Sequence, residues 1–184
     1  NTMECDEWDS TFGHVYKEMI DSGIQSIMAG HIALPEYSRK LRPGIKDEDI
    51  MPATLAPELI TDLLRGKLGF NGLVLTDASH MAGMTAAMPR SQQVPGAIAA
   101  GCDMFLFFND IEEDFGYMME GYRNGIITEE RLTDALRRIL GLKASLKLHE
   151  KMKKGTLIPE KEGLSVVGCA EHLAMAAEAA KKSI

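Results

Sequence analysis

The sequence of 184 residues lacks the features that mark several classes of protein. It contains no apolar run of about 20 residues, the length that a transmembrane helix needs, so no membrane partner is expected. The 20 Lys and Arg residues are outnumbered by 27 Asp and Glu, which gives a net charge of −7. Nucleic-acid binding normally needs a basic surface, and this charge therefore argues against a nucleic-acid partner.

Cysteines and short catalytic motifs are also scarce. The three cysteines are too few and too scattered for a disulfide framework or a zinc-binding spacing. No Gly-rich phosphate loop, Gly-x-Ser-x-Gly or Cys-x-x-Cys pattern is present. Residues 1–6 are polar and acidic and show no signal peptide, which favours the cytoplasm only slightly because the chain does not begin with Met.

What is present is an alternation of helical and strand patterns in a chain that is 45% hydrophobic and 26% charged, the balance of a soluble globular protein. The apolar spacing predicts helices at 11–21, 57–68, 93–100, 111–122, 128–146 and 169–182. Short apolar runs predict strands at 24–29, 72–76 and 103–108. Residues 32–53 are predicted to be long and irregular, and residues 151–162 to be a linker.

Strands that alternate with helices indicate right-handed βαβ units and a parallel sheet. Three parallel strands cannot close a barrel, and as an open sheet they leave two unpaired edges. We therefore expect an α/β fold that forms part of a larger protein. The open edges offer a route to self-association.

A polar residue follows each predicted strand, at His31, Asp77 and Asn109. In barrels and open α/β sheets alike, functional residues gather at the carboxyl ends of strands, so these three are expected to face one pocket. Asp77 is the sharpest candidate, because a carboxylate at the mouth of a buried strand is costly to desolvate unless it is used or paired. It is interpreted either as a nucleophile or base, or as a helix cap or half of a buried ion pair.

The neighbouring candidates each allow more than one interpretation. His31 would either hydrogen-bond a polar substrate or be satisfied by neighbouring backbone, and Asn109 allows the same choice. Asp77 and His80 together suggest a metal site, but two ligands fall short of the three that a catalytic zinc site uses. Met81 follows Asp77 closely and would line the pocket.

A motif in residues 68–78 resembles the nucleophile region of glycoside hydrolase family 3, with the sequence Leu-Gly-Phe-Asn-Gly-Leu-Val-Leu-Thr-Asp-Ala. The signature of that family has Leu-Gly-Phe, Asp or Asn, Gly, an apolar strand, Ser or Thr, and then the nucleophilic Asp, which matches Asp77. Three further segments are similar to the family in the same order: Ile-Met-Ala-Gly-His at 27–31, Pro-Ala-Thr-Leu-Ala-Pro at 52–57 and Ala-Gly-Cys-Asp-Met at 100–104. The resemblance covers residues 9–148.

The resemblance implies a fold and a domain organisation. The catalytic domain of the family is a (β/α)8 barrel, and the three predicted strands match its sixth, seventh and eighth. We therefore expect an α/β fold, a partial (β/α)8 TIM barrel of about three C-terminal βα units with trailing helices. Residues 1–148 would be the C-terminal segment of the barrel domain, 149–168 a linker, and 169–184 a helix leading to a second domain outside this chain. The first five strands of the family, its sugar-gripping Lys-His-Phe-Pro-Gly-His-Gly segment and its Asp-x-His acid/base loop have no match in the sequence.

The resemblance also implies a reaction, the retaining hydrolysis of a β-linked carbohydrate substrate. Asp77 would be the nucleophile, and His31, His80, Met81 and Asn109 would bind the substrate, with no metal and no organic cofactor. The Thr-Asp-Ala sequence around Asp77 is more similar to the β-N-acetylhexosaminidase branch of the family, whose substrate ends in an amino sugar. The β-glucosidases of the family more often have Ser-Asp-Trp.

Three alternatives stay open. The first is a family 3 β-glucosidase. The second is a catalytically inactive fragment that acts only structurally, because a nucleophile without its acid/base partner loses most of the rate. The third is a different (β/α) enzyme that uses Asp77 as a metal ligand.

Overall fold

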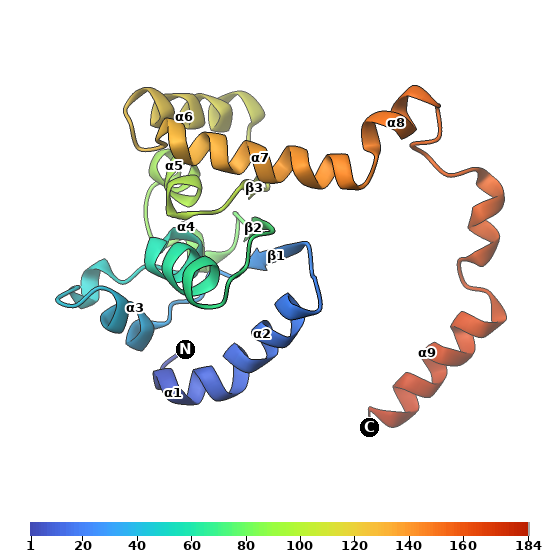
Figure 1. Ribbon diagram of the computed structural model, residues 1–184, viewed down its shortest axis with the longest axis horizontal. Coiled ribbons are helices and arrows are strands. Elements are labelled where there is room, and N and C mark those ends of the chain that lie inside the picture. The colour runs from blue at the N-terminus through green and yellow to red at the C-terminus, as the bar shows by residue number, and fades with distance from the viewer. Residues whose placement is uncertain (184) are drawn as a thin grey trace. The chain divides into compact units, whose positions relative to one another are not determined.

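A computed structural model describes residues 1–183 of the chain (Figure 1). The chain divides into two compact units, Asn1–Leu142 and Lys143–Ile184, and residue 184 lies outside the described part. The first unit contains the sheet and every candidate site residue.

Three strands form one parallel sheet in the first unit. They are, in spatial order, β1 (Ser26–Ala29), β2 (Leu73–Ala78) and β3 (Met104–Leu106). Leu73, Val74 and Thr76 of the central strand β2 are buried, as expected for a strand that is covered on both faces. The three predicted strands and the α/β class are thus confirmed, although β3 ends before Phe107.

Helices pack around this sheet in the first unit (Figure 1). The N-terminal helical segment comprises α1 (Cys5–Trp8), η1 (Asp9–Gly13) and α2 (His14–Asp21). The chain between β1 and β2 forms α3 (Pro35–Leu41), η2 (Asp47–Asp49), η3 (Ala53–Leu55) and η4 (Glu58–Lys67). After β2 come α4 (Ala82–Thr85) and α5 (Arg90–Ala100), and after β3 come α6 (Ile111–Arg123) and α7 (Glu129–Ser145). The predicted helices of this unit are confirmed.

The prediction of a long irregular segment at 32–53 is wrong. The structure forms α3 inside this segment, with Pro35 in the first turn of the helix. A proline is tolerated there because the first amides of a helix have no helical partner to lose. Tyr37 and Ser38 are buried, so the inner face of α3 packs into the core. Pro35 and Glu36 in the first turn and Arg39 and Lys40 in the last turn are ordinary helix signals, so the error was to take Pro35 only as a helix breaker.

Two clusters of buried apolar side chains hold the helices on the sheet. One joins the N-terminal helical segment, α3 and η4 to β2, around Trp8, Tyr37, Leu63 and Val74. The other lies between η3, α4, α5 and β3, and consists of Leu55, Met84, Val94, Ala97 and Phe105. Burying a large apolar side chain contributes about 1.5–3 kcal/mol, so these clusters dominate the packing of the first unit.

A buried charge network lies at the amino ends of β2 and β3. The fully buried carboxylate of Asp103 accepts from the Val74 amide at 2.9 Å and from Arg65 Nη2 of η4 at 2.8 Å. Its other oxygen pairs with Arg131 and Arg138 of α7. A buried charge needs partners of this kind to offset its desolvation. Asp103 thereby connects the sheet to two helices.

The second unit contains α8 (Leu148–Lys153), η5 (Lys161–Val166) and α9 (Ala170–Lys182), with side chains that are almost all exposed. The predicted helix at 169–182 is confirmed. Residues 149–168, the predicted linker, include most of α8 and all of η5. The division at 1–148, 149–168 and 169–184 stays a prediction. Of the helices in residues 1–183, none combines the length and apolar character needed to cross a membrane.

Candidate active site

The carboxyl ends of the three strands are joined by hydrogen bonds in the first unit. His31, just after β1, donates from Nε2 to the Ala78 carbonyl at 3.0 Å. The Ser79 amide, just after β2, donates to the Leu106 carbonyl at 2.7 Å. These bonds bring the residues that follow all three strands to one edge of the sheet, as parallel topology requires.

Asp77 lies at this edge on the central strand β2, with its side chain half-buried. Its Oδ1 accepts a hydrogen bond from the Ala78 amide at 2.7 Å. Within residues 1–183 this carboxylate forms no ion pair, caps no helix and has no second hydrogen-bond donor. Among the described residues, the Ala78 amide is therefore the hydrogen-bond partner of Asp77, and neither an ion pair nor a helix cap accounts for this carboxylate.

His31 is 8% exposed and is held from both sides of its ring. The Ala78 carbonyl can only accept, so Nε2 carries a proton, and Nδ1 lies 2.7 Å from the Thr54 hydroxyl. A Cβ atom on Gly83 would lie 2.6 Å from the His31 carbonyl oxygen, so α4 packs directly against this residue. The ring thus supports the strand end that carries Asp77, and it would bind a substrate only by exchanging one of these bonds.

The other predicted residues lie on the loops that follow β2 and β3. His80 and Asn109 are exposed, and Met81 is 47% exposed. The Asn109 amide donates to Asp114 Oδ2 at 2.9 Å, which fixes the loop backbone. These three residues lie on the loops at the edge that carries Asp77 and are exposed to solvent.

Sequence reasoning missed the residues that hold these loops, namely Ser79, Arg90 and Asp114. Arg90 of α5 forms a bidentate ion pair with the fully buried Asp114 of α6, at 2.7 and 2.6 Å. It also donates to the Ser79 hydroxyl at 3.2 Å. In the sequence both charges stand among other polar residues near the starts of their helices, where solvent exposure is the ordinary expectation. No local signal identifies them.

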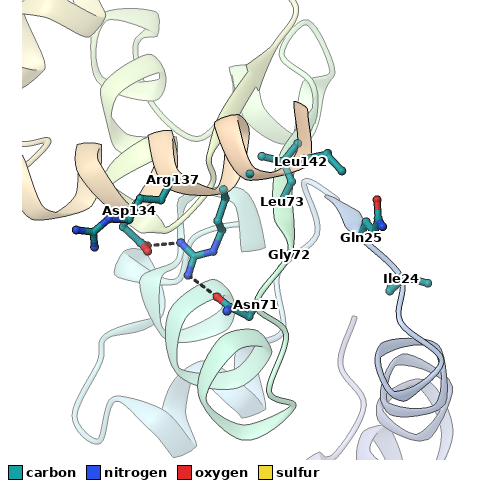
Figure 2. Close-up of a pocket in the computed structure, with 10 residues that line it drawn as sticks. Ile24, Gln25, Asn71, Gly72, Leu73, Asp134, Arg137 and Leu142 are labelled. Atoms are coloured by element: carbon teal, nitrogen blue, oxygen red, sulfur yellow. Dashed lines mark hydrogen bonds and ion pairs between the residues drawn. The ribbon is translucent and has the colours of Figure 1, made fainter. Parts of the chain in front are cut away.

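Two cavities of the first unit lie away from this edge. One of about 510 Å³ opens at the amino ends of β1 and β2, between Gln25, Asn71 and Gly72 and the α7 side chains of Asp134 and Arg137 (Figure 2). Another of about 400 Å³ lies beside β1 and is lined mainly by apolar side chains. Neither is lined by Asp77.

A metal centre finds no support in the part of the chain that the structure describes. No three His, Cys, Asp or Glu side chains of residues 1–183 are grouped so that they could hold a metal ion. The interpretation of Asp77 and His80 as metal ligands therefore has no third ligand among these residues.

Comparison with known proteins identifies the family. A family model described as the glycosyl hydrolase family 3 N-terminal domain matches residues 2–142. The chain belongs to glycosyl hydrolase family 3. This confirms the resemblance at residues 68–78.

Related family 3 proteins are considerably longer. A β-N-acetylglucosaminidase/β-glucosidase of Cellulomonas fimi is 54% identical over 184 residues, which is 100% of this chain and 32% of that protein. A β-hexosaminidase of Chromobacterium violaceum is 35% identical over 98 residues, 53% of this chain and 24% of that protein. The chain thus spans about a third or less of the length of these relatives.

Two similar solved structures are also longer than this chain. The β-glucoside phosphorylase BglX superposes with a TM-score of 0.91 at 40% identity, over 97% of this chain and 32% of that one. A family 3 β-N-acetylglucosaminidase from Paenibacillus sp. str. FPU-7 superposes with a TM-score of 0.68 at 26% identity, over 78% of this chain and 26% of that one.

Proposed function

We propose that this chain supplies the nucleophile of a retaining glycoside hydrolase that removes terminal β-linked N-acetylhexosamine residues. The observation that carries the proposal is the position of Asp77 at the carboxyl end of the central strand, where its half-buried carboxylate accepts the Ala78 amide and forms no ion pair with residues 1–183. The chain also belongs to a glycosyl hydrolase family, and retaining glycoside hydrolases use a carboxylate as the nucleophile.

The reaction has two steps. In the first, an oxygen of the Asp77 carboxylate attacks the anomeric carbon, the glycosidic bond breaks, and the leaving oxygen takes a proton from a general acid. In the second, that group acts as base on a water molecule, which attacks the anomeric carbon and releases Asp77. The resemblance assigns the acid/base to an Asp-x-His loop that has no match in this sequence, so the proposal gives that role to no residue of this chain.

The proposal extends to the fold. The parallel sheet, with edges at β1 and β3, would be the last three βα units of a (β/α)8 barrel. The site would then be completed by strands outside this chain, which agrees with the small share of the relatives that the chain spans. Residues 1–148, 149–168 and 169–184 would be the barrel segment, the linker and the helix leading to a second domain.

Sugar recognition is assigned to the exposed side chains at the same edge. His80 and Asn109 would hydrogen-bond the sugar, and Met81 would contact its apolar face. His31 would help to position Asp77, because its ring bonds the carbonyl of the next residue, Ala78. The curated relatives support an amino sugar, since both names quoted above include an N-acetylglucosaminidase or hexosaminidase activity. A β-glucosidase is the alternative, because the first of these names also includes that activity.

A second candidate differs in the group that releases the sugar. The structural neighbour with a TM-score of 0.91 is a β-glucoside phosphorylase. In that case phosphate instead of water would attack the anomeric carbon of the glycosyl–Asp77 ester, giving a sugar 1-phosphate and free carboxylate. The first step at Asp77 is the same for both acceptors.

The test is covalent trapping in the complete gene product that carries this chain. Two slow mechanism-based fluoroglycosides are compared, one resembling N-acetylglucosamine and one resembling glucose. We expect a mass gain on the peptide that contains Asp77, larger with the amino sugar and absent in Asp77→Asn. Release of the label is then timed with and without inorganic phosphate, because acceleration by phosphate identifies the phosphorylase reaction.

Other outcomes would contradict the assignment. A label on another residue, or turnover without any label, would remove Asp77 from the nucleophile role. A folded protein that neither turns over nor acquires a label would favour the inactive, structural alternative.

A further inference from the structure

The guanidinium of Arg90 connects three segments of the first unit at the edge that carries Asp77. Its Nη1 donates to the Ser79 hydroxyl at 3.2 Å and its Nη2 to the Phe107 carbonyl at 3.2 Å. Ser79 belongs to the loop after β2, and Phe107 belongs to the loop after β3. Nε and Nη2 also donate to the two carboxylate oxygens of Asp114 at 2.7 and 2.6 Å. One side chain therefore bonds both loops to α6, which packs beside α5 (Figure 1).

Asp114 of α6 is the acidic partner of Arg90, and the two side chains together form a junction between the two loops and α6. The side chain of Asp114 is fully buried, whereas that of Arg90 is 16% exposed. Asp114 also accepts a hydrogen bond from the backbone amide of Asn109 at 2.9 Å, so the loop after β3 is held at both Phe107 and Asn109. Burial alone would raise the pKa of Asp114, but the hydrogen bonds from Arg90 and the Asn109 amide outweigh it and hold the pKa below its usual value.

Stability alone does not explain so polar a junction. Burying two charges is costly, and a buried ion pair can often be replaced by apolar side chains without loss of stability. What apolar residues could not supply is the set of directional bonds to the two loops. Those loops carry the exposed side chains of His80 and Met81 on one side and of Phe108 and Asn109 on the other.

We propose that Arg90 and Asp114 are positioning residues for the reaction at Asp77. This inference rests on the proposed function, in which Asp77 is the nucleophile. Asp77 stands two residues before Ser79, so the path of the Ser79 loop sets where the carboxylate points.

The Ser79 hydroxyl itself donates to the Phe107 carbonyl, so the two loops also bond each other directly. Arg90 bonds both of these groups and Asp114 bonds the Asn109 backbone amide, so the ion pair would hold this contact against α6 and help to set the width of the edge that receives the sugar. A displacement of about 1 Å can slow a reaction about a hundredfold.

A matched junction lies at the opposite end of the strands and serves as the control. Asp103 is also fully buried, and it pairs with Arg65, whose side chain is 11% exposed. It bonds the start of β2 through the Val74 amide and forms no hydrogen bond with either loop in the described residues. Asp103→Asn therefore measures the loss of a buried charge away from Asp77.

The test compares four variants in the complete gene product: Arg90→Lys, Arg90→Met, the double variant Arg90→Met/Asp114→Leu, and Asp103→Asn. The double variant removes both charges together, so it leaves neither one buried and unpaired if a single substitution prevents folding. For each, thermal unfolding gives the folded fraction, and amide hydrogen exchange reports on residues 79–81 and 107–109. Kinetics give kcat and KM, and the fluoroglycoside gives the rate of labelling at Asp77.

We expect Arg90→Met and the double variant to exchange faster in both loops and to lose at least about tenfold in kcat and in labelling rate per folded molecule. Arg90→Lys should recover part of this loss because it keeps the charge. Asp103→Asn should lower the unfolding temperature while kcat and the labelling rate of the folded protein stay within about twofold.

The inference would be overturned if the double variant labelled and turned over at the wild-type rate, or if Asp103→Asn lost as much kcat per folded molecule. The proposed function fails separately, when the wild-type protein is not labelled at Asp77. In that case the positioning role of Arg90 and Asp114 is rejected together with the nucleophile role of Asp77. If the wild-type protein is labelled at Asp77, only the positioning role can fail.

Discussion

Replacing Asp77 by Asn keeps the size of the side chain and removes the negative charge that a nucleophile needs. In the complete gene product, kcat is expected to fall by about a thousandfold or more. The unfolding temperature should stay within a few degrees, because the Asn side-chain oxygen still accepts the Ala78 amide. Steady-state kinetics and thermal unfolding measure the two effects. Asp62→Asn, at an exposed position on η4, is the control and should leave kcat unchanged.

Tyr37 gives a pH dependence that is independent of catalysis. Burial raises its pKa to about 12, helped by the hydrogen bond to Asp9, whereas the unfolded value is 10.0. The folded state therefore keeps the phenol proton longer than the unfolded state, and the stability that this contributes is complete below pH 10 and lost as pH rises towards 12. The free energy of unfolding should fall by up to about 2 kcal/mol over this range.

Denaturant unfolding at a series of alkaline pH values measures this effect. Tyr37→Phe is the control, because it removes the titrating group and keeps the ring that packs edge-on against Trp8 at 5.1 Å between centroids. An equally steep loss of stability in Tyr37→Phe would assign the pH dependence to another group.

At single positions the sequence placed the candidate residues but not their partners. His31 was open to two interpretations, and the structure bonds its ring to Thr54 and Ala78, which are 23 and 47 residues away along the chain. Such distant contacts leave no trace in the local pattern. The same is true of the ion pair between Arg90 and Asp114, 24 residues apart.

The contact between helices α5 and α6 depends on a glycine. A Cβ atom on Gly121 of α6 would lie 2.3 Å from the Cβ of Pro95 on α5, which is far inside van der Waals contact. Gly121→Ala should therefore destabilise the protein by about 1–3 kcal/mol, because the two helices must separate. Denaturant unfolding measures the change.

The matched control lies on the same helix. A methyl group added to Gly116 of α6 would meet no atom within 4 Å beyond its chain neighbours and the nearby backbone of its own helix, so Gly116→Ala should stabilise by about 0.5–1 kcal/mol through helix propensity. Destabilisation of similar size by both substitutions would show that the loss comes from α6 itself and not from its contact with Pro95.

Elements with a strong local signal were predictable. The strands β1, β2 and β3 and the helices α5, α6, α7 and α9 follow from apolar runs and helical spacing, which are properties of neighbouring residues. The helix α3 was missed because Pro35 was taken as a sign of irregular structure, although it stands in the first turn of a short helix whose Tyr37 is buried in the core. Element ends were less predictable, as the early end of β3 shows.

For the molecule as a whole, the open sheet edges lead to a prediction about association. Met28 on the edge strand β1 is 54% exposed and borders the apolar cavity of about 400 Å³. Unpaired edges with apolar side chains tend to pair with another chain. Residues 1–184 produced alone are therefore expected to associate as concentration rises, and sedimentation velocity measures this.

Met28→Lys should weaken that association, because a charge on an edge strand opposes pairing. Met152→Lys is the control, at a side chain of the second unit that is 68% exposed. Sedimentation as a monomer at every concentration would show that the edges do not drive association.

The sequence by itself determined the order of the strands and of the helices other than α3, the family through the motif at 68–78, and the placement of Asp77 at the end of a buried strand. These follow from patterns among neighbouring residues. Only the tertiary structure decided which groups hold the site together: the ring of His31 on the Ala78 carbonyl, and the ion pair of Arg90 and Asp114 beneath the loops. The physical reason is that hydrogen bonds and ion pairs act over a few ångströms. Residues that are far apart along the chain come this close only when the helices pack on the sheet.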